Sequence, residues 1–393
     1  MPDALLLTTL VAAVAIGWWL GRRERSKPTD PAPPQGLARD YFVGLNYLLN
    51  DEQDRAIETF VGALEVNSET IDTHITLGNL FRSRGEADRA MKIHQNLLAR
   101  PSLTAAQGER VQLELARDFL SLGLLDRAER LLKGLLRDSH DEELRRLARR
   151  LLADLFEREG DWSEAFAVAT PQLIREDQEV RRAAAHWLCQ LAEEERANAT
   201  PVLARRHLKQ ALNVDPRCVR ANLLLASLEH DTGHYRQEIT LLSRIPAQDA
   251  AFTPTLLEPL SNAYRLLDDE DGLIRHLHDL LEETPYTSVI IQLAETIRHR
   301  QGIEPAIALV SEQLNREASL GALDYLIDLY HQHSHGEALE QLALLKRHTT
   351  DLLGKLPRHR CRRCGFTGDQ LHWQCPRCRS WGTTRPITGI EGE

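Results

Sequence analysis

Residues 75–94 read ITLGNLFRSRGEADRAMKIH, and the spacing of two small residues in this stretch decides the fold. Gly78 is followed 12 residues later by Ala90, and the same pair occurs 34 residues upstream as Gly44 and Ala56. A small residue on each helix of a hairpin lets the two backbones approach, and larger neighbours fill the space beside them. The stretch therefore predicts a helical hairpin that repeats every 34 residues.

This period and residue pattern resemble the tetratricopeptide repeat, whose stacked hairpins form a solenoid. Tyr47 and Phe81 hold the bulky position three residues after each glycine. The frame continues, with small changes of length, to a degenerate hairpin at 325–345 that we expect to cap an array of about eight to nine hairpins over 37–350. The later units are marked by Leu115, Ala116, Phe119, Gly123 and Ala128; Leu152, Ala153, Phe156, Gly160 and Ala165; Leu188, Ala192, Ala204, Leu208, Ala211 and Pro216; Leu225, Ala226, Gly233 and Leu242; Leu257, Tyr264, Leu277, Leu280 and Pro285; and Leu293, Ala294, Gly302 and Ala306.

The composition agrees with an all-α protein. Aromatic residues make up only 5% of the 393 residues, whereas Leu, Ala, Arg and Glu are abundant, as is typical of helices. The formal net charge of −10 argues against bulk electrostatic attraction to nucleic acid, which requires a basic face. The sequence has no His-Glu-x-x-His, Gly-rich phosphate loop or Gly-x-Ser-x-Gly motif. We therefore expect a binding protein and not an enzyme.

Residues 4–20 are almost entirely apolar and, as a helix, are just long enough to cross a thin bilayer core. Trp18 and Trp19 end this stretch, where indole rings favour the headgroup layer, and Arg22 and Arg23 follow directly. We predict a transmembrane anchor at 1–21, with the bulk of the chain on the cytoplasmic side, and a Pro-rich linker at 22–36. A cleaved signal peptide would carry its positive charge before the apolar stretch. A buried or interfacial helix is the alternative to an anchor.

The repeats predict a protein-binding surface. Such solenoids expose a concave face made mainly by the first helix of each hairpin. In the second repeat this face should carry Ile75, Asn79 and Arg82. These three residues are candidates for a peptide groove. The alternative for Asn79 and Arg82 is an ordinary solvated helix surface.

Residues 361–378 read CRRCGFTGDQLHWQCPRC and contain four cysteines as two Cys-x-x-Cys pairs. Each pair offers two thiolates to one ion, and two pairs complete a tetrahedral sulfur site. We predict that Cys361, Cys364, Cys375 and Cys378 bind one metal ion in a small module at 351–393. Two disulfides are the alternative, but a cytoplasmic location is reducing. A sulfur-only site accepts iron or zinc.

So small a module buries little apolar surface, so the bound metal would supply the missing stability. We expect its miniature core to contain Phe366, Leu371, Trp373 and Trp381. Arginines surround the module, and their partner could be nucleic acid, anionic lipid or an acidic protein surface. The predicted anchor favours lipid or protein. The arginines proposed to bind partners are Arg360, Arg362, Arg363 and Arg377.

The order of anchor, repeats and terminal knuckle closely resembles the family of lipopolysaccharide assembly protein B. The resemblance covers nearly the whole chain and includes GWWLGRR at 17–23, GNLFRSRG at 78–85 and the two Cys-x-x-Cys pairs. It implies a protein of the Gram-negative inner membrane with a periplasmic N-terminus. It also implies a rubredoxin-type knuckle that holds one iron, or alternatively zinc, through Cys361, Cys364, Cys375 and Cys378.

The same resemblance implies an adaptor that regulates lipopolysaccharide synthesis. Its implied partners are a membrane-bound AAA+ zinc protease, the UDP-acyl-N-acetylglucosamine deacetylase that commits precursors to lipid A, and a membrane regulator that senses periplasmic lipopolysaccharide. The adaptor would promote degradation of the deacetylase and could coordinate other lipopolysaccharide enzymes. Two other functions stay open from the residues: a membrane-tethered rubredoxin-like electron carrier, and a zinc-ribbon module that binds nucleic acid.

Overall fold

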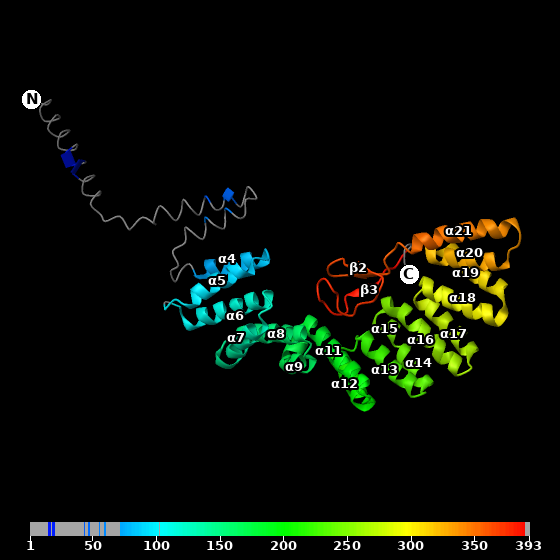
Figure 1. Cartoon of the computed structure of the whole chain (residues 1–393), viewed down its shortest axis with the longest axis horizontal. Coiled ribbons are helices and arrows are strands. Elements are labelled where there is room, and N and C mark those ends of the chain that lie inside the picture. Colours follow the sequence, from blue (N-terminus) through cyan, green and yellow to red (C-terminus); the bar gives the residue numbers. More distant parts are fainter. Residues whose placement is uncertain are drawn as a thin grey trace, which may run out of the picture. The chain divides into compact units, whose positions relative to one another are not determined.

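The computed structural model describes residues 71–101 and 103–389, together with positions 15, 16, 18, 19, 43, 46, 47, 55 and 59 (Figure 1). Two compact units divide the chain, one up to Ala128 and one from Glu129 onward. The linker predicted at 22–36 lies outside the described residues, as does most of the first repeat, including Gly44 and Ala56. The boundaries of the four predicted segments therefore stay predictions.

The predicted membrane anchor at 1–21 also lies outside the described residues, apart from Ala15, Ile16, Trp18 and Trp19. Within the part of the chain that the structure describes, no helix combines the length and the apolar character needed to cross a bilayer.

The first unit contains the hairpin that the opening stretch predicts. Its core joins Leu77, Phe81 and Ala90 in one cluster, and Gly78 is also buried at the crossing of the two helices. Gly78 and Ala90 are therefore both buried in this hairpin, and the side chain that lies against Gly78 is His94 of the second helix. The helices are α4 (Ile71–Ser83), α5 (Ala87–Leu98) and α6 (Ala105–Ser121), and α7 (Leu125–Asp138) contains the boundary between the units.

The second unit continues the array with one hairpin for each predicted repeat, and the mostly helical, tetratricopeptide-like fold class is confirmed. Three short elements that the repeat frame does not predict, α10, α15 and η1, lie between the hairpins. The helices are α8 (Glu142–Glu159), α9 (Trp162–Val168), α10 (Pro171–Glu176), α11 (Gln178–Ala197), α12 (Pro201–Val214), α13 (Val219–Asp231), α14 (Tyr235–Leu242), α15 (Ile245–Gln248), the 3-10 helix η1 (Ala250–Phe252), α16 (Thr253–Leu266), α17 (Glu270–Glu283), α18 (Thr287–Gln301), α19 (Ile303–Arg316), α20 (Leu320–His333) and α21 (Glu337–Leu353).

Local sequence signals fix where these helices begin and end. The Asp141 carboxylate accepts hydrogen bonds from the backbone N–H groups of Glu143 and Leu144, which caps the start of α8. Gly160 ends α8 in the left-handed region, with φ of 78°, and the chain turns at once into α9. Thr104 and Gln107 form a reciprocal capping box at the start of α6.

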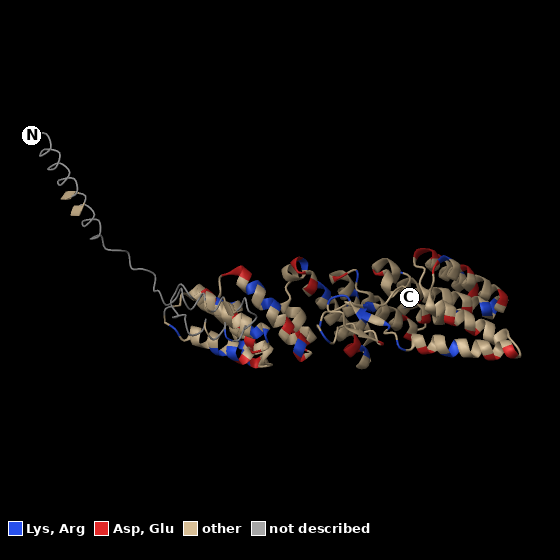
Figure 2. Cartoon of the chain, turned by 90° about the horizontal axis from the view of Figure 1, so that it is seen from above, with Lys and Arg blue, Asp and Glu red and all other residues tan. Residues whose placement is uncertain are grey.

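The buried surface of the second unit runs along the stacked hairpins. Alanines at the helix crossings are fully buried, as in Ala204 and Ala211 on α12 and Ala263 on α16. Large apolar residues such as Leu208 and Leu256 fill the remaining space between helices. Lys and Arg are interspersed with Asp and Glu along the helices of both units (Figure 2). Each unit is therefore a mixed-charge helical scaffold with an apolar interior between its hairpins.

A small antiparallel sheet follows α21. It has the strand order β2-β1-β3 and contains β1 (His359–Cys361), β2 (Thr367–Gly368) and β3 (Thr384–Pro386). Arg360 pairs with Thr367 on one side and with Arg385 on the other. The strand β3 contacts η1, so the sheet lies against the middle of the second unit and not beyond its last helix (Figure 1).

Candidate metal centre and its contacts with the repeat array

The two Cys-x-x-Cys segments fold into matching turns. In the first, the N–H of Cys361 donates to the carbonyl of Phe366 and the N–H of Gly365 to the carbonyl of Cys361. In the second, the N–H of Cys375 donates to the carbonyl of Ser380 and that of Arg379 to the carbonyl of Cys375. The residue after each pair has a positive φ, 73° at Gly365 and 57° at Arg379. Glycine adopts this conformation without strain in the first turn, whereas a non-glycine residue adopts it in the second.

The four sulfur atoms meet at one point. All four Sγ atoms lie within 4.8 Å of one another, with 3.7 Å between Cys361 and Cys378 and 3.6 Å between Cys364 and Cys375. A tetrahedron of thiolates at about 2.3 Å from a central ion has edges of about 3.8 Å, so the thiols fit a bound metal. All four are free cysteines, which excludes the two-disulfide alternative in this conformation. The donor set suits zinc and iron alike, so iron stays a prediction.

The surroundings of the site favour the thiolate of Cys361, whereas burial raises the pKa of the Cys375 thiol. Burial alone would raise the pKa of the Cys361 thiol, but hydrogen bonds from the Thr383 hydroxyl and from the N–H groups of Cys364 and Arg363 outweigh it and lower that pKa to about 6. A metal ion binds the deprotonated thiolate, so these donors prepare Cys361 for coordination. When bound, the ion would cross-link the two turns.

One buried carboxylate connects the knuckle to the array. Glu157, on α8, is only 9% exposed. It accepts hydrogen bonds from the indole Nε1 of Trp187 on α11 and of Trp381 in the knuckle, each at 2.8 Å. The side-chain amide of Gln374 donates to it at 2.7 Å, and the Arg379 guanidinium lies 3.5 Å away. The array and the knuckle thus share a single fully used acceptor.

Aromatic stacking makes the second connection. The His186 ring, on α11, stacks on Trp381 with 5.0 Å between ring centroids and 18° between planes. The Arg220 guanidinium lies over the same indole, 5.9 Å from its centroid. Trp373 stacks on Phe252 of η1 at 5.4 Å. The predicted self-contained core therefore differs from the structure, because the knuckle packs its tryptophans against the array.

Two ion pairs lie at the edges of this contact. Arg363 pairs with Glu179 on α11 at 3.0 Å, and Arg385 pairs with Asp249 beside η1 at 2.5 Å. Arg363 is about half exposed, so its pair contributes little, whereas the Arg385 pair is largely shielded from solvent. The knuckle is thus held at several points along the array.

The arginines predicted to bind partners lie at the surface of the knuckle. Arg360, Arg362, Arg363 and Arg377 are all exposed, which leaves their guanidinium groups accessible. Arg363 also donates to the Ser380 hydroxyl at 2.7 Å. Partner binding by these residues stays a prediction.

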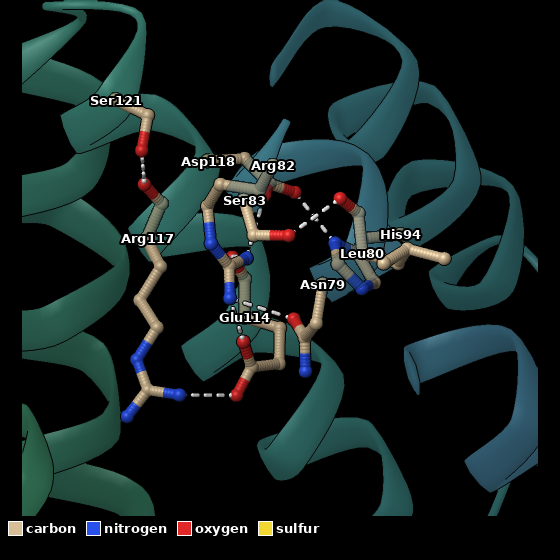
Figure 3. A network of polar contacts seen from close by, with 9 residues as sticks. All are labelled: Asn79, Leu80, Arg82, Ser83, His94, Glu114, Arg117, Asp118 and Ser121. Atoms are coloured by element: carbon tan, nitrogen blue, oxygen red, sulfur yellow. Dashed lines mark hydrogen bonds and ion pairs between the residues drawn. The ribbon is translucent and has the colours of Figure 1, made fainter. Parts of the chain in front are cut away.

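In the array, Arg82 belongs to a buried polar network that extends from α4 to α6 (Figure 3). Its guanidinium donates to Glu114 at 2.6 Å and to Asp118 at 2.7 Å, and it also bonds Asn79 at 2.6 Å. The second oxygen of Asp118 contacts Nδ1 of His94 at 2.5 Å, and both of these side chains are fully buried. The network joins α4, α5 and α6 by charged hydrogen bonds.

The three array residues predicted to bind a partner do not form one exposed surface. Ile75 is 7% exposed and packs with Ile71, Leu97 and Val111, and Asn79 and Arg82 are half-buried. Their placement gives each residue a role in packing or in the polar network. Partner binding by them also stays a prediction.

Sequence patterns did not identify Glu157, His186, Phe252 or Asp249 as contacts of the knuckle. The only available signal was an acidic residue, Glu157, directly after the apolar positions of a predicted repeat helix. The two cysteines outside the knuckle, Cys189 and Cys218, are buried, with 3.9 Å between their Sγ atoms.

Comparisons with known proteins agree with this architecture. A family model described as the rubredoxin metal binding domain matches residues 359–386. The chain is 33% identical over 391 residues to lipopolysaccharide assembly protein B of Escherichia coli K12, with 99% of each chain covered. It is also 33% identical over 400 residues to the protein of the same name from Haemophilus influenzae, covering 98% of this chain and 99% of that one.

Among solved structures, a tetratricopeptide repeat protein from Parabacteroides merdae aligns with 72% of this chain and 100% of its own, at a TM-score of 0.35 and 14% identity. The expected resemblance to one family is confirmed by the whole-length relatives. An identity of 33% across nearly the full length of both chains shows that this chain belongs to the lipopolysaccharide assembly protein B family.

Proposed function

We propose that this protein is a non-catalytic adaptor of the inner membrane that limits lipopolysaccharide synthesis. It promotes degradation of the lipid A-committing deacetylase by the membrane-bound AAA+ protease, and it helps to coordinate lipopolysaccharide assembly enzymes. The observation that carries the proposal is family membership over the whole length, because the name of the relatives gives them a role in lipopolysaccharide assembly.

The architecture supports an adaptor. Stacked helical hairpins present extended surfaces to other proteins, and the knuckle is fixed against the array by Glu157, His186 and Phe252. A rigid body of this kind holds a client in a defined position without chemistry of its own. Tethering client and protease to the same membrane raises their effective concentration.

In this proposal the segment at 1–21 anchors the chain with its N-terminus in the periplasm, and the repeats and knuckle act at the cytoplasmic face. The anchor engages the protease or the membrane regulator that senses periplasmic lipopolysaccharide. The array and the knuckle together hold the deacetylase. Nucleic acid is not expected as a partner of an acidic chain with net charge −10.

The test is the half-life of the deacetylase in cells depleted of this protein, measured by quantitative proteomics beside other inner-membrane proteins. We expect the deacetylase to become long-lived while the other membrane proteins keep their half-lives. A chain lacking residues 1–25 should fail to restore turnover. An unchanged half-life on depletion would contradict the adaptor role, and full rescue by the shortened chain would contradict the role of the anchor.

A further inference from the structure

A pocket of about 540 Å³ lies where the knuckle meets the array. Its walls come from the first turns of α11, the segment between α12 and α13, η1, and the strand β3. Four arginines line it, together with two aspartates. The lining charged residues are Arg181, Arg182, Asp215, Arg217, Asp249 and Arg385.

The positive charges of this pocket exceed the negative ones. Among the described residues, Arg181, Arg182 and Arg217 make no ion pair with a carboxylate. Asp249 is engaged by Arg385 at 2.5 Å, and Asp215 accepts the backbone N–H of Arg217 at 3.1 Å. Both aspartates therefore already have donors, and three guanidinium groups keep their hydrogen-bonding capacity for a ligand.

A buried histidine in the wall is influenced by the excess positive charge of the pocket. His186 is 4% exposed, and its Nδ1 has no hydrogen-bond partner among the described residues. Burial, reinforced by the charges of Arg220 and Arg182, lowers the pKa of His186 to about 3. Its ring is therefore neutral at physiological pH, and its orphan nitrogen is a further polar group in the pocket wall.

We propose that this pocket binds the carboxylates of an acidic peptide segment. Guanidinium groups bind carboxylates through paired hydrogen bonds, and those near low-dielectric walls bind them more strongly. The stacked rings of Phe252 and Trp373 in the wall offer an apolar surface to a neighbouring side chain of the peptide. The inference rests on the proposed adaptor function and deepens it, by giving the chemical class of client segment that the knuckle and array recognise together.

The shape and charge of the pocket favour a peptide over other anions. Its walls come from several separate segments, so the arginines converge on one concave site that a chain segment can enter. Asp215 and Asp249 would repel a densely charged polyphosphate, whereas their free lone pairs can accept backbone N–H groups of a peptide. A volume near 540 Å³ suits a few side chains.

The test measures fluorescence anisotropy of a labelled peptide, Glu-Asp-Phe-Glu-Glu-Leu-Asp-Glu, with the full chain in detergent micelles. The neutral probe replaces every Glu with Gln and every Asp with Asn. The pocket variant is Arg181→Gln with Arg217→Gln. The matched control, Arg206→Gln with Arg236→Gln, removes the same charge from two exposed arginines of α12 and α14 that do not line the pocket.

We expect the pocket variant to raise Kd for the acidic peptide about tenfold or more, while the control changes it by less than about twofold. The neutral peptide should bind the unchanged protein at least about tenfold more weakly than the acidic one. Equal affinity of the pocket variant and the unchanged protein for the acidic peptide would overturn the proposal. So would equal affinity for the two peptides.

A vesicle arm separates peptide from lipid. If the unchanged protein sediments with phosphatidylglycerol vesicles through Arg181 and Arg217 but does not bind the peptide, the site belongs to lipid and the proposal fails.

Measurements in cells distinguish the pocket proposal from the adaptor role. A deacetylase that becomes long-lived on depletion, without acidic-peptide binding by the pocket, overturns only the pocket proposal. Specific peptide binding with an unchanged deacetylase half-life overturns only the adaptor role.

Discussion

The carboxylate of Glu157, on a helix of the repeat array, accepts a hydrogen bond of 2.8 Å from the indole of Trp381, which lies 224 residues later in the knuckle. The same carboxylate accepts the indole N–H of Trp187 and the amide of Gln374. A buried charge is stable only when donors surround it, and here one donor, Trp187, comes from the array and the others come from the knuckle. The knuckle is thus part of the folded array and does not hang from its end.

Glu157→Gln should loosen the knuckle. The amide keeps one acceptor oxygen but turns an NH2 group toward existing donors, at an expected loss of about 2 kcal/mol. Hydrogen exchange of backbone amides in residues 359–386 should then become about thirtyfold faster. Glu194→Gln, at an exposed position of α11, is the control and should leave exchange unchanged. Equal protection of these amides in Glu157→Gln and in the unchanged protein would show that the shared carboxylate does not hold the knuckle.

The sequence predicted the hairpins because their signals are local. Gly78 with Ala90, and Gly160 after α8, mark close crossings and turns that any chain with this spacing must make. The four thiols were predicted for the same reason, since each Cys-x-x-Cys turn brings its own ligands together. The position of one turn relative to the other, which brings all four sulfur atoms together, depends on the folded knuckle.

The contact between knuckle and array could not be predicted from the sequence. Glu157 and Trp381 are 224 residues apart, and no periodicity relates them. His186 occupies an ordinary helix position, and its role follows from stacking on an indole that a separate segment supplies. The short elements α15 and η1, which place Phe252 beneath Trp373, also interrupt the repeat frame. Long-range packing of this kind depends on the assembled solenoid and not on local propensity.

Acid should weaken the same contact through His186. Burial and the charges of Arg220 and Arg182 lower its pKa to about 3, whereas an unfolded histidine titrates near about 6.5. Between about pH 6.5 and pH 3 His186 is protonated in the unfolded chain but stays neutral in the folded chain. The free energy of unfolding therefore keeps its full value above about pH 6.5 and decreases as the pH drops toward 3. The contribution of His186 to the slope of the unfolding free energy against pH should approach about 1.4 kcal/mol per pH unit.

The measurement compares the pH dependence of denaturant unfolding between pH 5.5 and 7.5 for the unchanged protein and for His186→Phe. Phenylalanine keeps an aromatic ring for stacking but does not titrate, so this variant should lose the part of the slope that His186 supplies. His140→Gln, at an exposed position, is the control and should keep the slope. Identical slopes in the unchanged protein and His186→Phe would assign the acid sensitivity to other groups, including the cysteine thiols.

Removing one metal ligand should release the knuckle and spare the array. In Cys361→Ser the site keeps three thiols, so we expect less than one metal ion per chain and loss of exchange protection in residues 359–386. Helix content measured by circular dichroism should stay within a few per cent, because the hairpins have their own core. Arg377→Gln, an exposed change inside the second Cys-x-x-Cys turn, should keep the metal. A fully protected knuckle in Cys361→Ser, or in the unchanged protein treated with a chelator, would refute the structural role of the metal.

The close crossing of α4 and α5 gives a prediction for the array itself. A Cβ atom at Gly78 would lie 2.5 Å from Nε2 and 2.6 Å from Cε1 of His94. His94 cannot move aside easily, because it is fully buried and its Nδ1 is held by Asp118 at 2.5 Å. Gly78→Ala should therefore destabilise the first unit by about 1–3 kcal/mol, although alanine is the better helix former.

Gly108→Ala is the matched control, because Gly108 also lies within a helix but has open space around its Cα among the described residues. At Gly108 the added methyl group meets no neighbouring atom, so only the higher helix propensity of alanine affects stability. The free energy of unfolding of Gly108→Ala should therefore rise by up to about 1 kcal/mol. Urea unfolding followed by circular dichroism compares the two variants. Opposite signs are expected because the crossing with His94 exists only at Gly78. A stabilising Gly78→Ala would show that the histidine can withdraw, and that the small residue is not what sets the approach of these two helices.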